Sequence, residues 1–277
     1  MKIYRYGLIV FYGACIFMAS DALAENYFSL GVEGFKDHYN EKFQTVDLSG
    51  NPTGEFEVDT HSLFRSVTAS YEHDYNRYFT ALDGRYSSGT SDYKSGGSGT
   101  LNGDPEWETD TRIRTGAILS MSGGVIKPYI GLGWRYYFDD GKGRETTTGA
   151  GAYNRQISQI YIPVGLSDRF TYANWIFTPL LEGDLLAWGR VASRLGEVPG
   201  HSNVVNIQNA GTGFRAEFMM GQQYKDFTWE VGPFIRHWHI QRSDALVTVN
   251  NSHGTFVSGF EPDNTRLQYG LAAKITY

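Results

Sequence analysis

The sequence predicts an all-β fold, an antiparallel up-and-down barrel of about 10 strands (about 8–12) preceded by a segment that is removed. Three observations support this prediction. Apolar and polar residues alternate over many short stretches, and the connections between these stretches are short and long in turn. The composition is rich in glycine (33) and tyrosine (19) and only 19% charged. The net charge of -6 leaves no basic surface for nucleic acid, so we expect no nucleic-acid partner.

Residues 1–24 have the pattern of a secretory signal peptide. Lys2 and Arg5 precede a short apolar stretch, and Ala22-Leu23-Ala24 supplies the small-x-small cleavage pattern. The apolar stretch is too short for an ordinary membrane-spanning helix, which needs about 20 residues. We therefore expect cleavage after Ala24 and a single mature domain over residues 25–277.

The end of the chain shows the clearest strand. From Leu267 to Tyr277 every second residue is apolar or aromatic, and the residues between them are polar or small. A strand places alternate residues on opposite faces, whereas a helix with 3.6 residues per turn does not. The same alternation predicts strands over 26–37, 61–72, 77–87, 107–119, 128–137, 159–166, 174–187, 210–220, 229–236 and 266–277.

The connections between these strands alternate in length. Long ones, rich in Gly, Ser, Asn, Thr and Asp, are expected near 38–59, 88–105, 139–155, 188–206 and 241–263. The short ones fall near 73–76, 120–125, 167–173 and 221–225. Short turns at one end and long loops at the other are typical of barrels that cross a membrane.

The polar face of the strands distinguishes a membrane barrel from a soluble one. It carries eight acidic and eight basic side chains, which would cost about 2–4 kcal/mol for each Arg or Lys if they faced lipid near the midplane. Glycine alternates with charge, as in Gly131-x-Gly133-x-Arg135, and we expect these glycines to make room for long Arg and Glu side chains. The sequence therefore predicts a barrel with its apolar face in lipid and its charges inside.

A barrel of about 10 strands is narrow, so the inward charges are expected to fill it with ion pairs. In this hypothesis Arg112, Arg114, Arg135, Arg215 and Arg236 pair with Glu182, Asp184, Glu217 and Glu230. The predicted lumen network consists of Glu33, Asp83, Arg85, Arg112, Arg114, Arg135, Glu182, Asp184, Arg215, Glu217, Glu230, Arg236 and Arg266. The open alternative is a narrow path for ions or small solutes.

The segments 128–137 and 161–166 and the terminal aromatic Tyr277 resemble those of Gram-negative outer-membrane β-barrel proteins. The resemblance covers the whole mature chain. It implies a location in the cell outer membrane, both termini in the periplasm, and contact with membrane lipid and lipopolysaccharide. It also implies that the barrel assembly machinery reads the last strand, which ends at Tyr277.

Four tryptophans are expected at the two membrane boundaries. With both termini in the periplasm, Trp175 and Trp229 lie near the inner rim, and Trp107 and Trp188 near the outer rim. An amphipathic ring suits the headgroup region, so these four residues form the predicted aromatic girdle.

No complete catalytic set is present. The nearest features to those of omptin proteases, which are ten-stranded barrels, are Asp59-Thr60-His61, Glu108-Thr109-Asp110 and Glu182-Gly183-Asp184. The last two are expected to point inward, so we predict that the protein is not an enzyme. His237 and His239 have a spacing that could bind metal, but rim histidines are more often interfacial polar groups, so we expect no metal site and no cofactor.

The function predicted from the sequence is structural, with an adhesin-like role for five long surface loops. Loops on a rigid scaffold are suited to recognition, and the ligand would be a host or environmental surface. A narrow porin-like channel is the alternative, and an omptin-like surface hydrolase is a more distant one.

Overall fold

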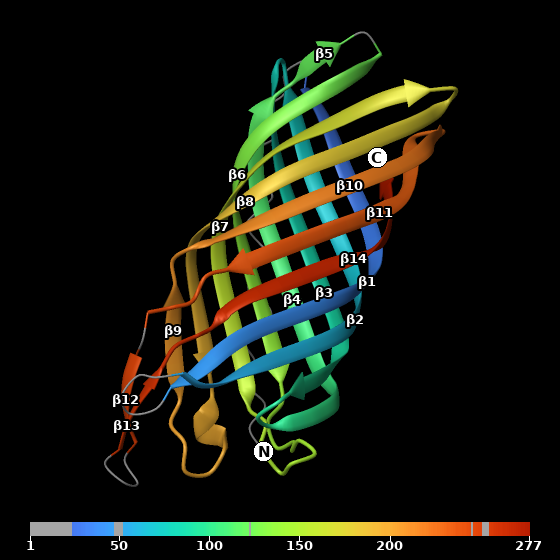
Figure 1. Ribbon diagram of the computed structural model, residues 1–277. Coiled ribbons are helices and arrows are strands. Elements are labelled where there is room, and N and C mark those ends of the chain that lie inside the picture. The colour runs from blue at the N-terminus through green and yellow to red at the C-terminus, as the bar shows by residue number, and fades with distance from the viewer. Residues whose placement is uncertain (1–23, 47–51, 122, 245, 251–254) are drawn as a thin grey trace, which may run out of the picture.

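The computed structural model describes residues 24–46, 52–121, 123–244, 246–250 and 255–277, and ten long strands in it form one barrel (Figure 1). Each is antiparallel to its neighbours. The strands are β1 (Ala24–Val46), β2 (Pro52–Tyr75), β3 (Tyr78–Ser95), β4 (Gly99–Ala117), β6 (Gly124–Asp140), β7 (Asn154–Tyr172), β8 (Trp175–Ser193), β10 (Gly211–Tyr224), β11 (Phe227–Ile240) and β14 (Asp263–Thr276). The predicted fold is confirmed, whereas the signal peptide lies almost entirely outside the described residues.

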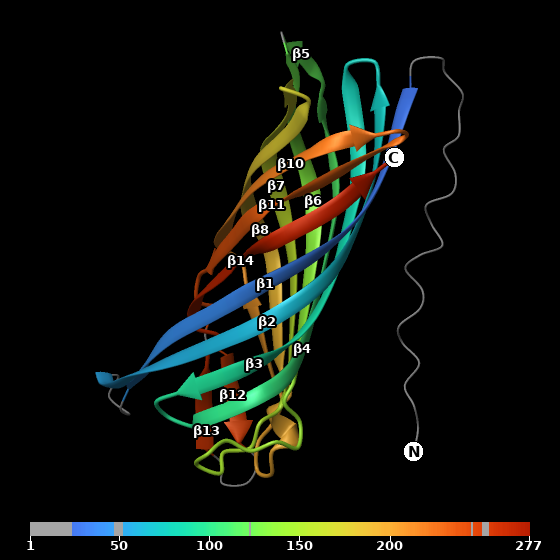
Figure 2. The same ribbon diagram turned by 90° about the vertical axis from the view of Figure 1, so that its right-hand side faces the viewer.

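The sheet closes on itself because β14 pairs with both β11 and β1. Ser29 stands opposite Thr276, and the backbones of Phe28 and Tyr277 exchange two hydrogen bonds of 2.9 and 3.0 Å. The start of β1 and the end of β14 therefore lie at the same end of the barrel, here called the terminal end (Figure 2). The opposite end is called the loop end.

Short turns join the strands at the terminal end. Asn76, Asn174 and Lys225 occupy the left-handed region, with φ of 53°, 67° and 53°, in turns that join β2 to β3, β7 to β8 and β10 to β11. Such conformations suit tight hairpins because they match the twist of the strands. At the fourth connection a short strand, β5 (Leu119–Met121), pairs with β6.

Two of the predicted long loops are wrong, because most of 38–59 and 88–105 is strand. The β1–β2 and β3–β4 hairpins continue well past the predicted strand ends (Figure 2). The outer face is no longer apolar there, so the alternation of apolar and polar residues stops. The backbone hydrogen bonds between the strands nevertheless continue. The segment made of these two hairpin ends, residues 38–46, 52–61, 90–95 and 99–105, is called the loop-end extension.

The remaining loop-end connections also contain regular structure. Between β8 and β10 lie a 3-10 helix (Leu195–Glu197) and β9 (Val204–Gln208), which pairs with β8. Between β11 and β14, β12 (Leu246–Asn250) and β13 (Thr255–Gly259) form a separate two-stranded sheet. In the described residues no helix is long and apolar enough to cross a membrane.

The apolar face of the barrel points outward, as predicted. Val32, Leu63 and Leu271 are 57%, 60% and 63% exposed, although all three lie in regular strands. Large exposed hydrophobics at such positions on strand after strand form a continuous apolar band, which is the surface that a lipid bilayer solvates.

Aromatic rings occupy much of the narrow interior. Phe35 stacks on Phe64 at 5.3 Å, and Tyr161 meets Trp238 edge-on at 5.2 Å. The expectation that glycines make room for Arg and Glu is wrong at two positions. A Cβ on Gly133 would lie 2.1 Å from the Tyr161 ring, and one on Gly165 would lie 2.4 Å from the Tyr129 ring.

Candidate functional site

A belt of buried ion pairs crosses the middle of the barrel. Arg112 contacts Glu182 at 2.5 Å and Asp83 at 3.2 Å. Arg215 lies 3.5 Å from the same Glu182 and 3.4 Å from Asp110. The Glu182 side chain is fully buried, and the Tyr129 hydroxyl also donates to it at 2.7 Å. One carboxylate thus lies against two guanidinium groups, and the charge-assisted hydrogen bond that Arg112 donates is stronger than a neutral one.

A second group of pairs continues the belt on the β1 side. Arg236 contacts Glu33 at 2.6 Å and Glu217 at 3.4 Å. Arg85 lies 3.0 Å from Glu108, and its other nitrogen is 3.8 Å from Glu33. These side chains come from strands far apart in sequence, and barrel closure brings them together.

Several predicted partners differ in the structure. Among the described residues Asp184 has no ion-pair partner, and its Oδ1 atom is buried without a hydrogen-bond partner. Arg114 contacts Asp83 at 2.6 Å, and Glu230 lies 3.2 Å from Lys274 and 4.0 Å from Arg169. Arg135 lies 4.0 Å from Glu108 and over the Trp238 ring, 4.9 Å from its centroid.

Three acidic partners were absent from the predicted network. Glu108 and Asp110 were recognised on the polar face but not as partners, and Asp37, which contacts Arg266 at 2.5 Å, was not recognised at all. Asp37 ends the predicted strand 26–37, where the inward Phe35 interrupts the polar pattern. Its place on the same face as Glu33 was the available signal.

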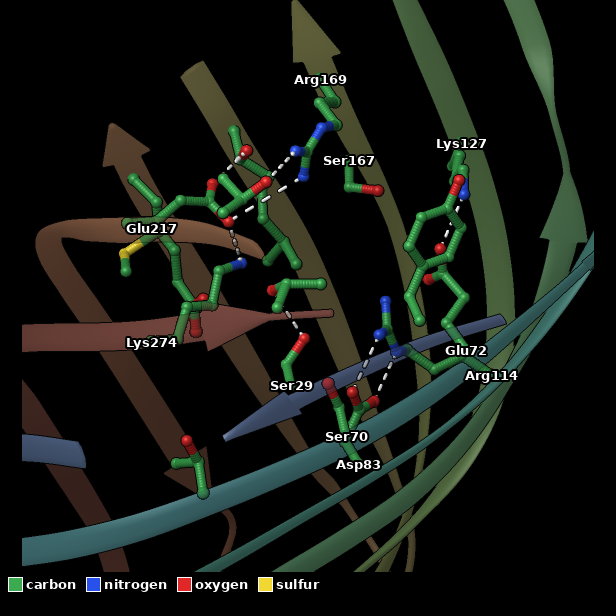
Figure 3. A pocket seen from close by; sticks show the side chains of 18 of the residues that line it. Ser29, Ser70, Glu72, Asp83, Arg114, Lys127, Ser167, Arg169, Glu217 and Lys274 are labelled. Atoms are coloured by element: carbon green, nitrogen blue, oxygen red, sulfur yellow. Dashed lines mark hydrogen bonds and ion pairs between the residues drawn. The ribbon is translucent and has the colours of Figure 1, made fainter. Parts of the chain in front are cut away.

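A large cavity opens on the terminal-end side of the belt. Its volume is about 760 Å³, and its lining mixes both charges and hydroxyl groups. Figure 3 shows Lys127, Arg169, Glu217 and Lys274 on its wall. Lys127 is bound there by two carboxylates, with its Nζ atom 2.6 Å from Glu72 and 2.7 Å from Asp74.

A smaller cavity of about 250 Å³ lies on the loop-end side of the belt. Its wall contains the aromatic side chains of Tyr39, Tyr93 and Tyr153 and the acidic side chains of Asp104 and Asp139. No described residue lines both this cavity and the terminal-end cavity.

Asp104 and Asp139 form a carboxyl pair in the loop-end cavity, beyond the outward ring cluster of Trp107, Tyr136 and Phe138. Burial, together with a hydrogen bond to Asp104, raises the pKa of Asp139 to about 9. Asp139 therefore favours its protonated form at neutral pH. Arg144, from the β6–β7 connection, donates to Asp104 at 2.8 Å.

The predicted girdle tryptophans lie near the two ends of the apolar band. Trp175 and Trp229 meet edge-on at 5.9 Å near the terminal end. Trp107 lies 5.1 Å from Tyr136, and Trp188 stands opposite Ile160 towards the loop end. Tyr277 is 62% exposed, and its ring lies 5.7 Å from that of Phe227.

The sequence features considered as catalytic do not converge. Asp59 and His61 lie on the outer side of the β1–β2 hairpin, whereas Glu108, Asp110 and Glu182 point inward and are buried. No histidine appears among the described residues that line the loop-end cavity. A carboxyl pair is present there, but without the Asp-His pair of an omptin-like site.

A second cluster joins His38, which the sequence analysis did not single out, to Asp59 and His61. The Nε2 atoms of the two histidines lie 2.5 and 3.2 Å from the two oxygens of the Asp59 carboxylate. The rim histidines considered from the sequence are arranged differently. His239 pairs with Asp263 at 2.7 Å, and His237 stands opposite Leu267.

Comparison with known proteins relates this geometry to other barrels. Neither a family model nor a curated protein matches the sequence significantly. The structure is similar to that of the outer membrane protease OmpT from Escherichia coli, with a TM-score of 0.64 and 7% identity over 91% of this chain and 96% of that one. The fold is that of outer-membrane β-barrels. The architecture that the sequence resemblance implied is therefore confirmed.

Two other barrels match less well. The translocator domain of the autotransporter NalP from Neisseria meningitidis has a TM-score of 0.41 and 10% identity over 90% of this chain and 88% of that one. The Pseudomonas putida toluene transporter TodX has a TM-score of 0.32 and 9% identity over 91% of this chain and 89% of that one.

Proposed function

We propose that this protein is an outer-membrane barrel whose lumen is closed by side chains and which acts at the cell surface by binding, without catalysing a reaction. In this proposal the terminal end faces the periplasm, because bacterial barrels have their short turns there. The loop-end extension and the loop-end cavity then face the outside. Membrane lipid and lipopolysaccharide surround the apolar band, and the assembly machinery inserts the barrel through its last strand.

The separation of the two lumen cavities is the observation that supports this proposal. No described residue lines both the 760 Å³ and the 250 Å³ cavity. Between them lie the side chains of Glu108 and Glu182, which are 2% and 0% exposed and bound to arginines from other strands. Rearranging them to open a path would leave charges unpaired in a low-dielectric interior, which is costly.

The loop-end cavity supports the binding role. Tyrosine offers a large, rigid contact surface with a polar tip at low cost in conformational entropy, and it is enriched where proteins recognise ligands. Tyr39, Tyr93 and Tyr153 surround the acidic pair there. A cationic or hydroxyl-bearing group on a surface ligand fits such a lining.

Conductance across planar bilayers tests the closed lumen. The reconstituted barrel is expected to give no steady steps, while a general porin recorded in the same membranes gives nanosiemens steps. A steady nanosiemens conductance of the purified barrel would favour the channel alternative and overturn the proposal.

Deletion of the β12–β13 hairpin tests the surface role. These strands form their own sheet, and below them the backbone N–H of Ser243 donates to the Glu261 carbonyl at 3.0 Å, so the barrel retains its pairing. Bacteria with residues 245–259 replaced by a Gly-Ser segment of equal length should attach less well to host-cell monolayers. Attachment equal to that of the intact protein would count against this role.

Peptide hydrolysis is the second candidate, and the pair of Asp104 and Asp139, in which burial raises the pKa of Asp139, favours it. The similar fold of the outer membrane protease OmpT shows only that a barrel of this kind can carry an active site. Incubation of the reconstituted protein with a peptide library, beside an Asp139→Asn variant, decides between the candidates. Cleavage that the variant abolishes would replace the binding proposal.

A further inference from the structure

Three side chains with metal-binding groups meet on the outer face of the β1–β2 ladder. His38 and His61 are directly opposite one another across the two strands. Asp59 precedes His61 by two residues and therefore lies on the same face, diagonal to His38. Adjacent strands thus bring together residues that are 21 and 23 positions apart along the chain.

The three groups converge at their ligand atoms. His38 Nε2 is 2.5 Å from Asp59 Oδ1, and His61 Nε2 is 3.2 Å from Asp59 Oδ2. The two imidazole rings are stacked, with centroids 4.4 Å apart and planes 9° apart. One nitrogen from each ring and one carboxylate oxygen all lie within 4.8 Å of one another.

When no ion is present, each Nε2 can donate a hydrogen bond to one oxygen of the Asp59 carboxylate. When both imidazoles instead carry their proton on Nδ1, each Nε2 presents a lone pair towards the same point beside Asp59. A divalent cation at that point would be bound by two nitrogens and an oxygen, the combination that Zn²⁺ takes in sites with an open position.

We propose that His38, Asp59 and His61 form a Zn²⁺ site on the outer wall of the barrel, with water completing the coordination. The side chains are 40%, 32% and 65% exposed, so an ion and its water can reach them. The site joins two strands of the loop-end extension. It depends neither on the closed lumen nor on ligand binding in the loop-end cavity.

The neighbouring charges are compatible with a bound cation. Lys42 lies on the same face but contacts Glu57 at 3.9 Å, and Asn40 also donates to Glu57 at 2.6 Å. Lys36, two residues before His38, stands opposite Leu63, and its flexible stem allows the ammonium group to turn away.

His239 provides a matched control on the same rim. It contacts one carboxylate, that of Asp263, at 2.7 Å, and Thr265 stands opposite it on β14. It therefore has the single His–Asp contact of a surface pair without the second imidazole. Replacing it should leave Zn²⁺ binding unchanged.

Calorimetric titration of the purified barrel in detergent micelles with Zn²⁺ tests the proposal. The intact chain should bind one ion, and His38→Ala and His61→Ala should each weaken binding by at least about tenfold, whereas His239→Ala should not. Co²⁺ should give the visible absorption of a low-coordinate site in the intact chain and lose it in both site variants. Heat-modifiable migration on SDS gels checks that each variant is folded.

Two outcomes would overturn the proposal. One is the absence of saturable Zn²⁺ binding by the folded, intact barrel. The other is saturable binding that His38→Ala and His61→Ala leave unchanged, since the ion would then be held elsewhere. Asp59→Asn keeps the side-chain shape, so its weaker binding would show that the carboxylate charge contributes.

Discussion

The lipid-facing middle of the barrel and the loop-end extension are built from the same continuous strands but differ in what each face meets. In the middle, Ile130 and Leu271 are 54% and 63% exposed on the outside while buried ion pairs occupy the inside. In the extension, polar side chains such as Glu57 and Asn40 lie on the outside as well. Apolar and polar residues therefore alternate only where the two faces of a strand meet different surroundings. Backbone hydrogen bonding sustains the strand in both regions.

The largest effect should come from breaking the belt in the middle. Glu182→Ala leaves Arg112 and Arg215 without their shared carboxylate, and an uncompensated buried charge costs about 3–5 kcal/mol. The measurement is the free energy of unfolding by urea in lipid vesicles. In the extension, Glu57→Ala removes an exposed pair and should cost at most about 1 kcal/mol. Equal decreases in the free energy of unfolding for the two variants would contradict the proposed difference between the two regions.

An arginine introduced on the outer face should also destabilise the middle of the barrel more than the loop-end extension. Ile130→Arg places a guanidinium group in the apolar band and should cost about 2–4 kcal/mol if it lies near the midplane. Asn102→Arg, at an exposed position of the extension, should change the free energy of unfolding by no more than about 0.5 kcal/mol. A tolerated arginine at residue 130 would mean that the band does not face hydrocarbon.

The smallest effect concerns pH in the loop-end cavity. The folded chain keeps the Asp139 proton up to a pH of about 9, whereas the unfolded chain releases it near its usual value of 3.8, so this group lowers stability as pH rises between those values. Asp139→Asn removes this loss and should stabilise the barrel by about 1–3 kcal/mol at pH 9, with little change at pH 4.

The control for that prediction is the neighbouring exposed residue. Asp140→Asn should leave the pH dependence of unfolding unchanged, because this side chain is solvated. If the stability of Asp139→Asn depends on pH in the same way as that of the unmodified barrel, the pKa of Asp139 is not raised in the folded chain.

Sequence reasoning predicted the fold where the two faces differ most. The alternation over 128–137 and 266–277 placed strands correctly, because one face meets an apolar solvent there. It ended β1 near residue 37, since from His38 onwards the outer face is polar. The number of strands followed from the rhythm of turns, which does not depend on the solvent.

The charges that face inward were predictable, but only some of their partners were. Arg112 and Arg215 contact Glu182, and Arg236 contacts Glu217, as predicted. Asp184 was expected to pair, whereas Asp83 and Asp110 hold the arginines instead. Partners across the lumen depend on the register that closure imposes, and a single strand carries no signal of it. Local pairings are easier, because the neighbouring strands β1 and β2 place His38 opposite His61.

The seam between β14 and β1 has a consequence for how this chain matures. Ser29 Oγ lies 2.8 Å from Thr276 Oγ1, although 247 positions separate the two residues. All other pairings between long strands join strands that follow one another along the chain, but the second edge of β1 is paired only after β14 has been synthesised. Closure of the barrel is thus a final, non-local event. A chain that ended before its last strand would keep two strand edges with unpaired backbone groups.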